Sequence, residues 1–197
     1  MASTEITQKT YAGLPSPDIS EILRYLGAKE ADTQTLSLIE DCIKEASGKL
    51  SYRAIYREYA ISQNGGELDL GFSKVYSKDL SRNLAGCKKI ILFACTLGAE
   101  ADRLIYRYTR TAPSRAVVLD ALMSERVEAL CDRLEAEATE GKKSRPRFSA
   151  GYGDLSIELQ KDIFTALDCE RRIGLTLGGS LLMSPTKSVT AIIGITE

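Results

Sequence analysis

The sequence predicts a single α+β domain in which helices flank a twisted, mainly antiparallel sheet. Its 197 residues are enough for one substantial core. Segments with the apolar spacing of helices are interspersed with β-prone segments, yet no regular βαβ repeat with a G-x-G-x-x-G turn is present. These observations favour an antiparallel α+β architecture over a Rossmann fold.

Apolar stripes and end signals predict five helices. They span residues 18–27, 33–47, 101–108, 113–139 and 157–168. In the first helix, Asp18 is the predicted N-cap and Glu21 reaches back to it as in a capping box. Pro113 begins the longest helix, and Ser156 is the predicted N-cap of the last one.

The longest predicted helix carries a face of carboxylates beside its apolar stripe. This face consists of Glu125, Glu128, Asp132 and Glu135. Solvation is the ordinary role of such a face. The alternative is that one of these carboxylates points into a binding site.

Three long strands are predicted, at residues 52–61, 89–96 and 189–195. The second is an almost continuous apolar run, which is typical of a central strand buried on both faces. Two hairpins are predicted from glycine-rich turns. The turn at Asn64-Gly65-Gly66 is followed by a returning strand at 68–72, and Gly178-Gly179 separates 173–177 from 181–183.

Charge and hydropathy restrict the classes of partner. The chain has 26 basic and 27 acidic residues, so its net charge of -1 gives no strong attraction for phosphate backbones, and nucleic-acid binding is disfavoured. No apolar run approaches the roughly 18 residues of a membrane span. Residues 1–10 lack the features of a secretory signal, so we expect a cytoplasmic protein. We expect an N-terminal arm at 1–17 and one domain at 18–197.

Cysteine and histidine content exclude several kinds of site. The cysteines are odd in number, widely spaced and without a C-x-x-C pair, so we expect reduced thiols in the core. They are Cys42, Cys87, Cys95, Cys131 and Cys169. The chain has no histidine, which excludes His-based zinc sites, Ser-His-Asp triads and Cys-His dyads.

The segment from Arg147 to Asp154, with the sequence RFSAGYGD, is the most informative for function. Arg147 offers a rigid fork of donors to a carboxylate or phosphate. Gly151 and Gly153 lack a Cβ and permit close approach of a ligand to the backbone, while Tyr152 adds an aromatic face and a hydroxyl. This combination favours a small anionic or zwitterionic ligand. The alternative is a surface turn with one solvated arginine.

Two segments together resemble the activation domain of cobalamin-dependent methionine synthase. They are residues 147–154 and 183–189, and a predicted helix separates them. The shared signature is an arginine followed, after three residues, by a glycine-tyrosine pair. Residues 24–27, the Thr96-Leu97-Gly98 helix entry and the long helix resemble compact, free-standing members of that family. The resemblance covers the chain from about Asp18 to its end.

The resemblance implies a domain that binds S-adenosylmethionine and sits over the corrin ring when the cobalt of cobalamin has been oxidised. The methyl group then passes to reduced cobalt. Arg147 would hold the methionine carboxylate and Glu128 the ammonium group, with Glu125 or Asp132 as alternatives to Glu128. Such chemistry requires positioning of the sulfonium rather than side-chain acid-base catalysis.

The resemblance also assigns roles within the glycine-tyrosine loop. Backbone groups at Gly151 and Gly153 would approach the ligand. Tyr152 would lie at the mouth, facing the adenosyl group or the corrin. Asp154 matches a position that acts through its backbone, which leaves its side chain free to cap the next helix.

No Asp-x-His-x-x-Gly motif is present, so the cobalamin would come from a partner. The implied partner is a methionine synthase, or a related corrinoid protein, that lacks its own activation domain. A flavodoxin-like reductant is a further implied partner. The chain would then be an accessory reactivation subunit for methyl transfer from S-adenosylmethionine to cobalamin.

Two other functions remain as alternatives. Gly178-Gly179-Ser180 stands where the family usually has an acidic residue before a serine, which favours a non-catalytic docking module that has lost S-adenosylmethionine binding. A stand-alone S-adenosylmethionine-dependent methyltransferase ranks lowest. The glycine-rich first turn of Rossmann-type methyltransferases is missing, and no general base stands out.

Overall fold

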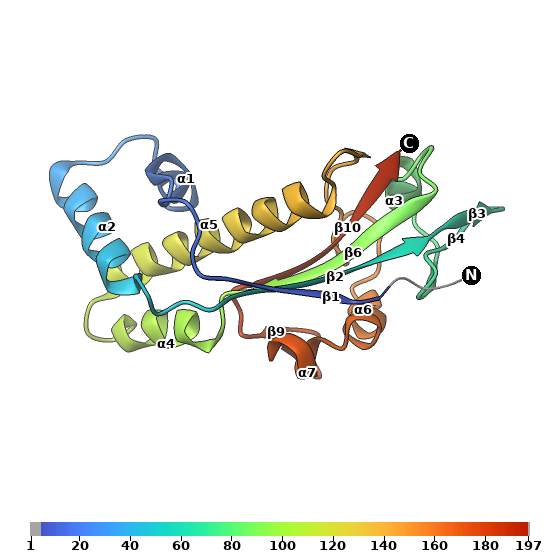
Figure 1. Ribbon diagram of the computed structural model, residues 1–197. Coiled ribbons are helices and arrows are strands. Elements are labelled where there is room, and N and C mark those ends of the chain that lie inside the picture. The colour runs from blue at the N-terminus through green and yellow to red at the C-terminus, as the bar shows by residue number, and fades with distance from the viewer. Residues whose placement is uncertain (1–4, 197) are drawn as a thin grey trace.

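In the computed structural model, which describes residues 5–196, helices cover both faces of a five-stranded sheet (Figure 1). The strands lie in the order β1, β2, β6, β10, β7, and every neighbouring pair is antiparallel. Their bounds are Thr7–Tyr11, Tyr52–Ala60, Lys89–Thr96, Ser188–Thr196 and Lys143–Ser144. The predicted α+β class with an antiparallel sheet is confirmed.

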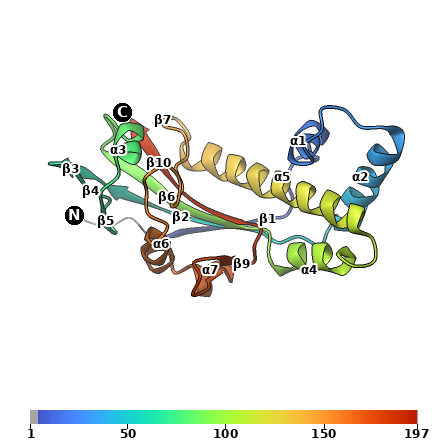
Figure 2. The same cartoon turned by 180° about the vertical axis from the view of Figure 1, so that it is seen from behind.

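The helices divide between the two faces of the sheet. Their bounds are α1 Ile19–Tyr25, α2 Thr33–Ala46, α3 Lys78–Asn83, α4 Ala99–Tyr108, α5 Pro113–Ala138, α6 Leu159–Leu167 and α7 Cys169–Ile173. Helix α5 runs along one face, and α1, α2 and α4 pack against it at one end (Figure 1). Helices α6 and α7 lie on the opposite face, as the reverse view shows (Figure 2).

Strand β6 separates two hydrophobic clusters because its side chains alternate between the faces. Ile91 and Phe93 belong to the cluster under α5, whereas Ile90 and Leu92 belong to the cluster under α6 and α7. All four are fully buried. The prediction of a central strand buried on both faces is therefore confirmed. The five cysteines are free, and all except the half-buried Cys87 are buried, as expected of reduced thiols.

Both predicted turns form hairpins with short strands, but the predicted strand at 52–61 is not an arm of the first hairpin, because it pairs with β1 and β6 in the main sheet. The first joins β3 (Ser62–Asn64) to β4 (Glu67–Asp69), and β5 (Lys74–Val75) completes a small separate sheet. The second joins β8 (Thr176–Leu177) to β9 (Met183–Ser184).

Two details of the predicted strands are wrong. Ile173 belongs to α7 and not to a strand. The returning strand predicted at 68–72 ends at Asp69, whose Oδ1 accepts the Gly71 N–H at 2.9 Å, and Gly71 has a φ of +79°. This side-chain hydrogen bond favours a turn over a longer strand.

The start of α1 agrees only in part with a capping box. Asp18 is the N-cap, and its Oδ1 accepts the Ser20 N–H at 2.8 Å. Glu21, however, pairs with Arg24 at 2.7 Å and does not reach back. The Asp18 N–H instead donates to Glu125 Oε1 of α5 at 3.2 Å. A tertiary contact therefore replaces the local one.

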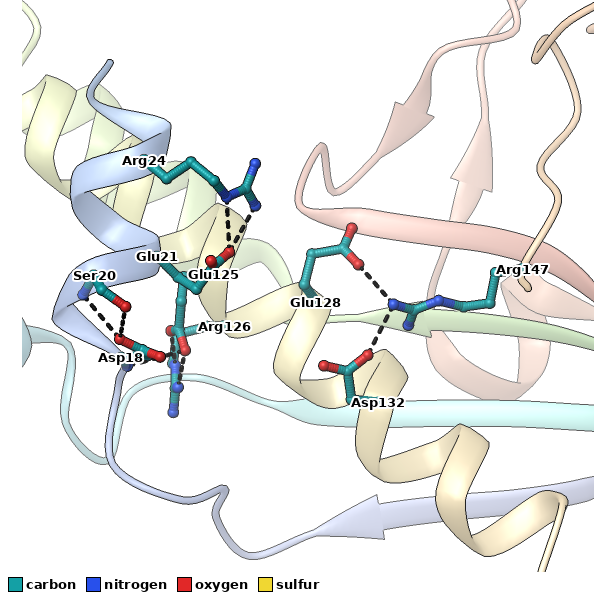
Figure 3. Close-up of polar contacts among 9 residues, drawn as sticks. All are labelled: Asp18, Ser20, Glu21, Arg24, Glu125, Arg126, Glu128, Asp132 and Arg147. Atoms are coloured by element: carbon teal, nitrogen blue, oxygen red, sulfur yellow. Dashed lines mark hydrogen bonds and ion pairs between the residues drawn. The ribbon is translucent and has the colours of Figure 1, made fainter. Parts of the chain in front are cut away.

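The expectation that Glu125 is solvated is wrong. Glu125 and Arg126 form a buried ion pair (Figure 3). Arg126 Nη1 also donates to Pro15 O at 2.5 Å. The segment before α1 crosses α5 at this point and shields both charges from water. Buried charges require such partners.

Helix α6 begins two residues later than predicted, at Leu159. Ser156 Oγ accepts the Glu158 N–H at 3.2 Å, so the predicted cap stabilises a turn ahead of the helix. The chain from Ser149 therefore reaches α6 through a compact loop.

Part of the predicted N-terminal arm belongs to the sheet. Strand β1 pairs with β2 from Thr7↔Tyr56 to Tyr11↔Tyr52. The boundary at residue 18 stays a prediction, and residues 1–4 and 197 lie outside the described part of the chain. Within residues 5–196, none of the helices has the length and apolar character that crossing a bilayer requires.

The close packing of β10 yields a stability prediction at Gly194. A Cβ at this position would lie 2.7 Å from Cys87 Sγ and 2.8 Å from Leu84 Cδ2. We expect Gly194→Ala to lower the free energy of unfolding by about 1–3 kcal/mol, as overpacking does, in urea denaturation. Gly179→Ala is the control, because a Cβ there meets nothing within 4 Å. Equal midpoints for the two variants would contradict the packing described.

Candidate functional site

Arg147 joins the segment after β7 to helix α5 (Figure 3). Its Nη2 donates to Asp132 Oδ1 at 2.8 Å and to Glu128 Oε2 at 3.2 Å. Its Nε lies 3.5 Å from Glu135 Oε2. Residues at these spacings share one face of a helix. The predicted acidic face therefore contacts Arg147 through Glu128, Asp132 and Glu135. We call Arg147 and these three carboxylates the arginine cluster.

In the arginine cluster Arg147 and Glu135 are partly buried and Asp132 is exposed, and the cluster has an excess of negative charge. The Arg147 side chain is 25% exposed. Burial alone would lower the pKa of Arg147, but Cys131 and the three carboxylates hold that pKa above its ordinary value. The Arg147 Nη1 atom is buried and has no hydrogen-bond partner among the described residues. A buried donor without a partner is costly, but this atom is closed to solvent, so an acceptor reaches it only when its surroundings rearrange.

The glycine-tyrosine loop has the backbone shape that its glycines allow. Gly151 and Gly153 have φ values of +85° and +56°, a region that residues with a Cβ rarely adopt. A Cβ at Gly151 would also lie 2.9 Å from Ile157 Cδ1, and one at Gly153 would lie 2.5 Å from Asp79 Oδ2. The packing of the loop thus accounts for both glycines without a ligand. Their proposed approach to a ligand stays a prediction.

The side chain of Tyr152 lies on the surface of the protein. Its side chain is 70% exposed, and its ring meets Phe148 edge-on with the centroids 5.4 Å apart. Phe148 is anchored in turn, since its N–H and C=O both bond to Ile192 of β10 at 2.9 Å. The aromatic face of Tyr152 is therefore held in place and accessible.

Asp154 caps a helix, but not the next one in sequence. Its Oδ2 accepts the Lys78 N–H at 2.8 Å, and its Oδ1 accepts from Ser77 Oγ and from the Asp79 N–H. These groups lie at the N-terminus of α3. The Ser77 hydroxyl and these N–H groups lower the pKa of Asp154. The expectation that its side chain caps the following helix is wrong, because the loop folds back onto α3.

A cavity of about 480 Å³ lies beside the arginine cluster, between α5, α6 and β10. Its volume is within the range of about 300–1,000 Å³ that small-molecule sites occupy. The lining residues are Glu128, Ser149, Ala150, Ile157, Gln160, Leu181, Leu182, Met183, Thr186, Ser188, Val189 and Thr190. Of the predicted site residues, Glu128 lines this cavity. Arg147 contacts Glu128, and the glycine-tyrosine loop continues from Ala150.

The sequence did not identify two polar residues of the cavity as site residues. Gln160 and Thr190 are both buried, and Thr190 Oγ1 donates to Gln160 Oε1 at 2.9 Å. A signal for Gln160 existed, since it is a polar residue between the inward-facing Leu159 and Ile163 of a predicted helix. No comparable signal marks Thr190, because threonine is common in strands.

The carboxylates of α5 yield a pH-dependent prediction. Burial raises the pKa of Glu135, so its ionisation opposes folding as the pH rises above the unfolded pKa. A hydrogen bond from Arg133 lowers the pKa of Glu137, so its ionisation contributes stability that is lost as the pH falls through the folded pKa. We expect Glu135→Gln to raise, and Glu137→Gln to lower, the free energy of unfolding at pH 7.

Urea unfolding at pH 7 and pH 3 measures both effects. At pH 3 both differences from the unmodified protein should shrink, because this pH lies below the ordinary pKa of glutamate and the charges then contribute less to folding. If both substitutions change the free energy of unfolding at pH 7 in the same direction, the opposite pKa shifts of Glu135 and Glu137 are contradicted.

No protein-family model matches the sequence, and no curated protein matches it either. In three dimensions the chain is similar to the MetH reactivation domain, in its crystal structure bound to AdoHcy (S-adenosylhomocysteine). The TM-score is 0.72 at 15% sequence identity, and the match covers 96% of this chain and 78% of that chain. The predicted resemblance in fold is confirmed, and the chain has the fold of the MetH reactivation domain.

Proposed function

We propose that this protein binds S-adenosylmethionine and supports the reductive methylation of cobalamin on a partner protein. The observation that carries the proposal is the position of the arginine cluster. Arg147, with its unpaired Nη1, is paired with Glu128, and Glu128 lines a cavity of suitable size. The likeness in fold to a domain whose crystal structure contains AdoHcy supports it further.

The charges of the arginine cluster suit the amino-acid end of such a ligand. A zwitterion presents a carboxylate and an ammonium group close together. The Arg147–Glu128 pair, 3.2 Å apart, can exchange its mutual contact for these two groups and leave no charge unpaired. Asp132 and Glu135 remain to hold the guanidinium in place.

The chemistry requires orientation of the ligand more than acid-base catalysis. The cobalamin of the partner supplies the cobalt nucleophile, and the leaving group is a neutral thioether. Arg147 and Glu128 would fix the amino-acid end of the ligand, and the rest of the ligand would lie in the cavity. Holding reactants in this way can account for a large part of a rate acceleration.

The mouth of the cavity suits docking of a partner. Ile157 and Leu182 line the cavity and are 43% and 72% exposed, and Tyr152 on the adjoining loop is 70% exposed. Apolar surface around a cavity often marks an interaction site. The proposed partner is a cobalamin-binding methionine synthase, or a related corrinoid protein, without an activation domain of its own. A flavodoxin-like reductant would supply the electron.

A docking module without ligand binding is the second candidate function. The observation that favours it is the pairing of Arg147 with carboxylates of its own chain. In that case the arginine cluster would be a structural link between α5 and the loop. The two candidates differ in whether the Arg147–Glu128 contact opens for a ligand.

Isothermal titration with S-adenosylmethionine and AdoHcy separates the two functions. We expect both ligands to bind the unmodified protein, and Arg147→Met to weaken binding by about 10- to 100-fold, the effect of losing hydrogen bonds to a charged group. Arg145→Met is the matched control, because Arg145 Nη2 bonds to Ala85 O outside the cavity. An absence of heat with both ligands would leave only the docking function.

A further inference from the structure

Gln160 occupies a fixed position in the wall of the cavity. It is 4% exposed, and its Oε1 accepts from Thr190 Oγ1 at 2.9 Å. In this arrangement Oε1 faces Thr190 and accepts the hydrogen bond of its hydroxyl. The Nε2 donors then point away from Thr190.

The Nε2 atom of Gln160 is available to a ligand. It donates to no group in the described part of the chain, yet it is not among the buried polar atoms that lack a partner. Since the residue lines the cavity, its open side is the cavity. A buried amide with one satisfied end and one open end is a typical element of ligand recognition.

The neighbouring edge of β10 is open at the same place. The N–H and C=O of Ile192 both bond to Phe148, so they point away from β6. Backbone groups two residues along a strand point to the same side, and those of Thr190 therefore also point away from β6. No partner for them occurs within residues 5–196. The cavity thus presents two donors and one acceptor: Gln160 Nε2 with the N–H and C=O of Thr190.

We propose that Gln160 reads the purine of the bound nucleoside, with Nε2 donating to a ring nitrogen. The inference rests on the proposed function and names the residue that recognises the base. A purine carries acceptor nitrogens around its rings, and adenine adds an exocyclic amino group that suits a backbone acceptor such as Thr190 C=O. The arginine cluster at Glu128 and the Gln160 subsite would therefore hold the two ends of one ligand.

Deaza analogues of AdoHcy test this role without altering the protein. The 1-deaza, 3-deaza and 7-deaza analogues each replace one ring nitrogen by C–H and so remove one acceptor. We expect one of the three to bind the unmodified protein about tenfold more weakly than AdoHcy, the effect of one hydrogen bond. Equal affinities for all four compounds would overturn the inference.

The variant Gln160→Met then identifies the donor, because methionine has a similar length and no N–H. We expect AdoHcy to bind this variant about tenfold more weakly, and the sensitive analogue to lose no further affinity. Thr190→Val removes the hydroxyl that contacts Oε1 but keeps Nε2 and the backbone edge, so we expect it to weaken AdoHcy less than Gln160→Met does. Thermal melts of both variants report the structural part of the Gln160–Thr190 contact.

The outcomes separate this inference from the proposed function. If the unmodified protein binds AdoHcy but Gln160→Met weakens AdoHcy and every analogue by the same factor, Gln160 does not read the base, and only this inference is wrong. If the unmodified protein binds neither AdoHcy nor S-adenosylmethionine, both proposals are wrong.

Discussion

The ion pairs between Arg147 and helix α5 are the interaction on which the site depends. They attach the segment after β7 to the helix that covers one face of the sheet. The same segment then bonds to β10 through Phe148 and forms the glycine-tyrosine loop. The bonds of Phe148 to β10 and of Asp154 to α3 hold the same loop, so the ion pairs act together with them to position it beside the cavity. Arg147 is 25% exposed but Asp132 is 69% exposed, so water screens the contact with Asp132 the most.

The excess of carboxylates around Arg147 distinguishes this arrangement from an ordinary salt bridge. A single partner would neutralise the guanidinium, whereas three leave negative charge for a cationic group. At the same time Nη1 stays without an acceptor. A ligand with an ammonium and a carboxylate group can pair with one of these carboxylates and with the guanidinium, while the net charge of the cluster stays the same. The structure can thus be stable alone and still bind a ligand at the expense of one internal contact.

Local sequence signals predicted the elements, and tertiary contacts decided the roles of several side chains. Strand β6 and helix α5 were predictable because their apolar patterns are long and regular. The carboxylates of α5 were predicted to share a face, but whether that face meets water or Arg147 depends on how a distant segment crosses the helix. The same reason explains Glu125, which the segment before α1 covers, and Asp154, which caps α3.

A crystal structure of the protein with AdoHcy would show whether the arginine cluster holds the ligand. We expect the ligand in the cavity beside β10, with its carboxylate on Arg147 Nη1, its ammonium on Glu128, and the Arg147–Glu128 distance longer than the 3.2 Å found here. An empty cavity at saturating AdoHcy, with Arg147 still bonded to both Glu128 and Asp132, would show that the arginine cluster does not bind this ligand.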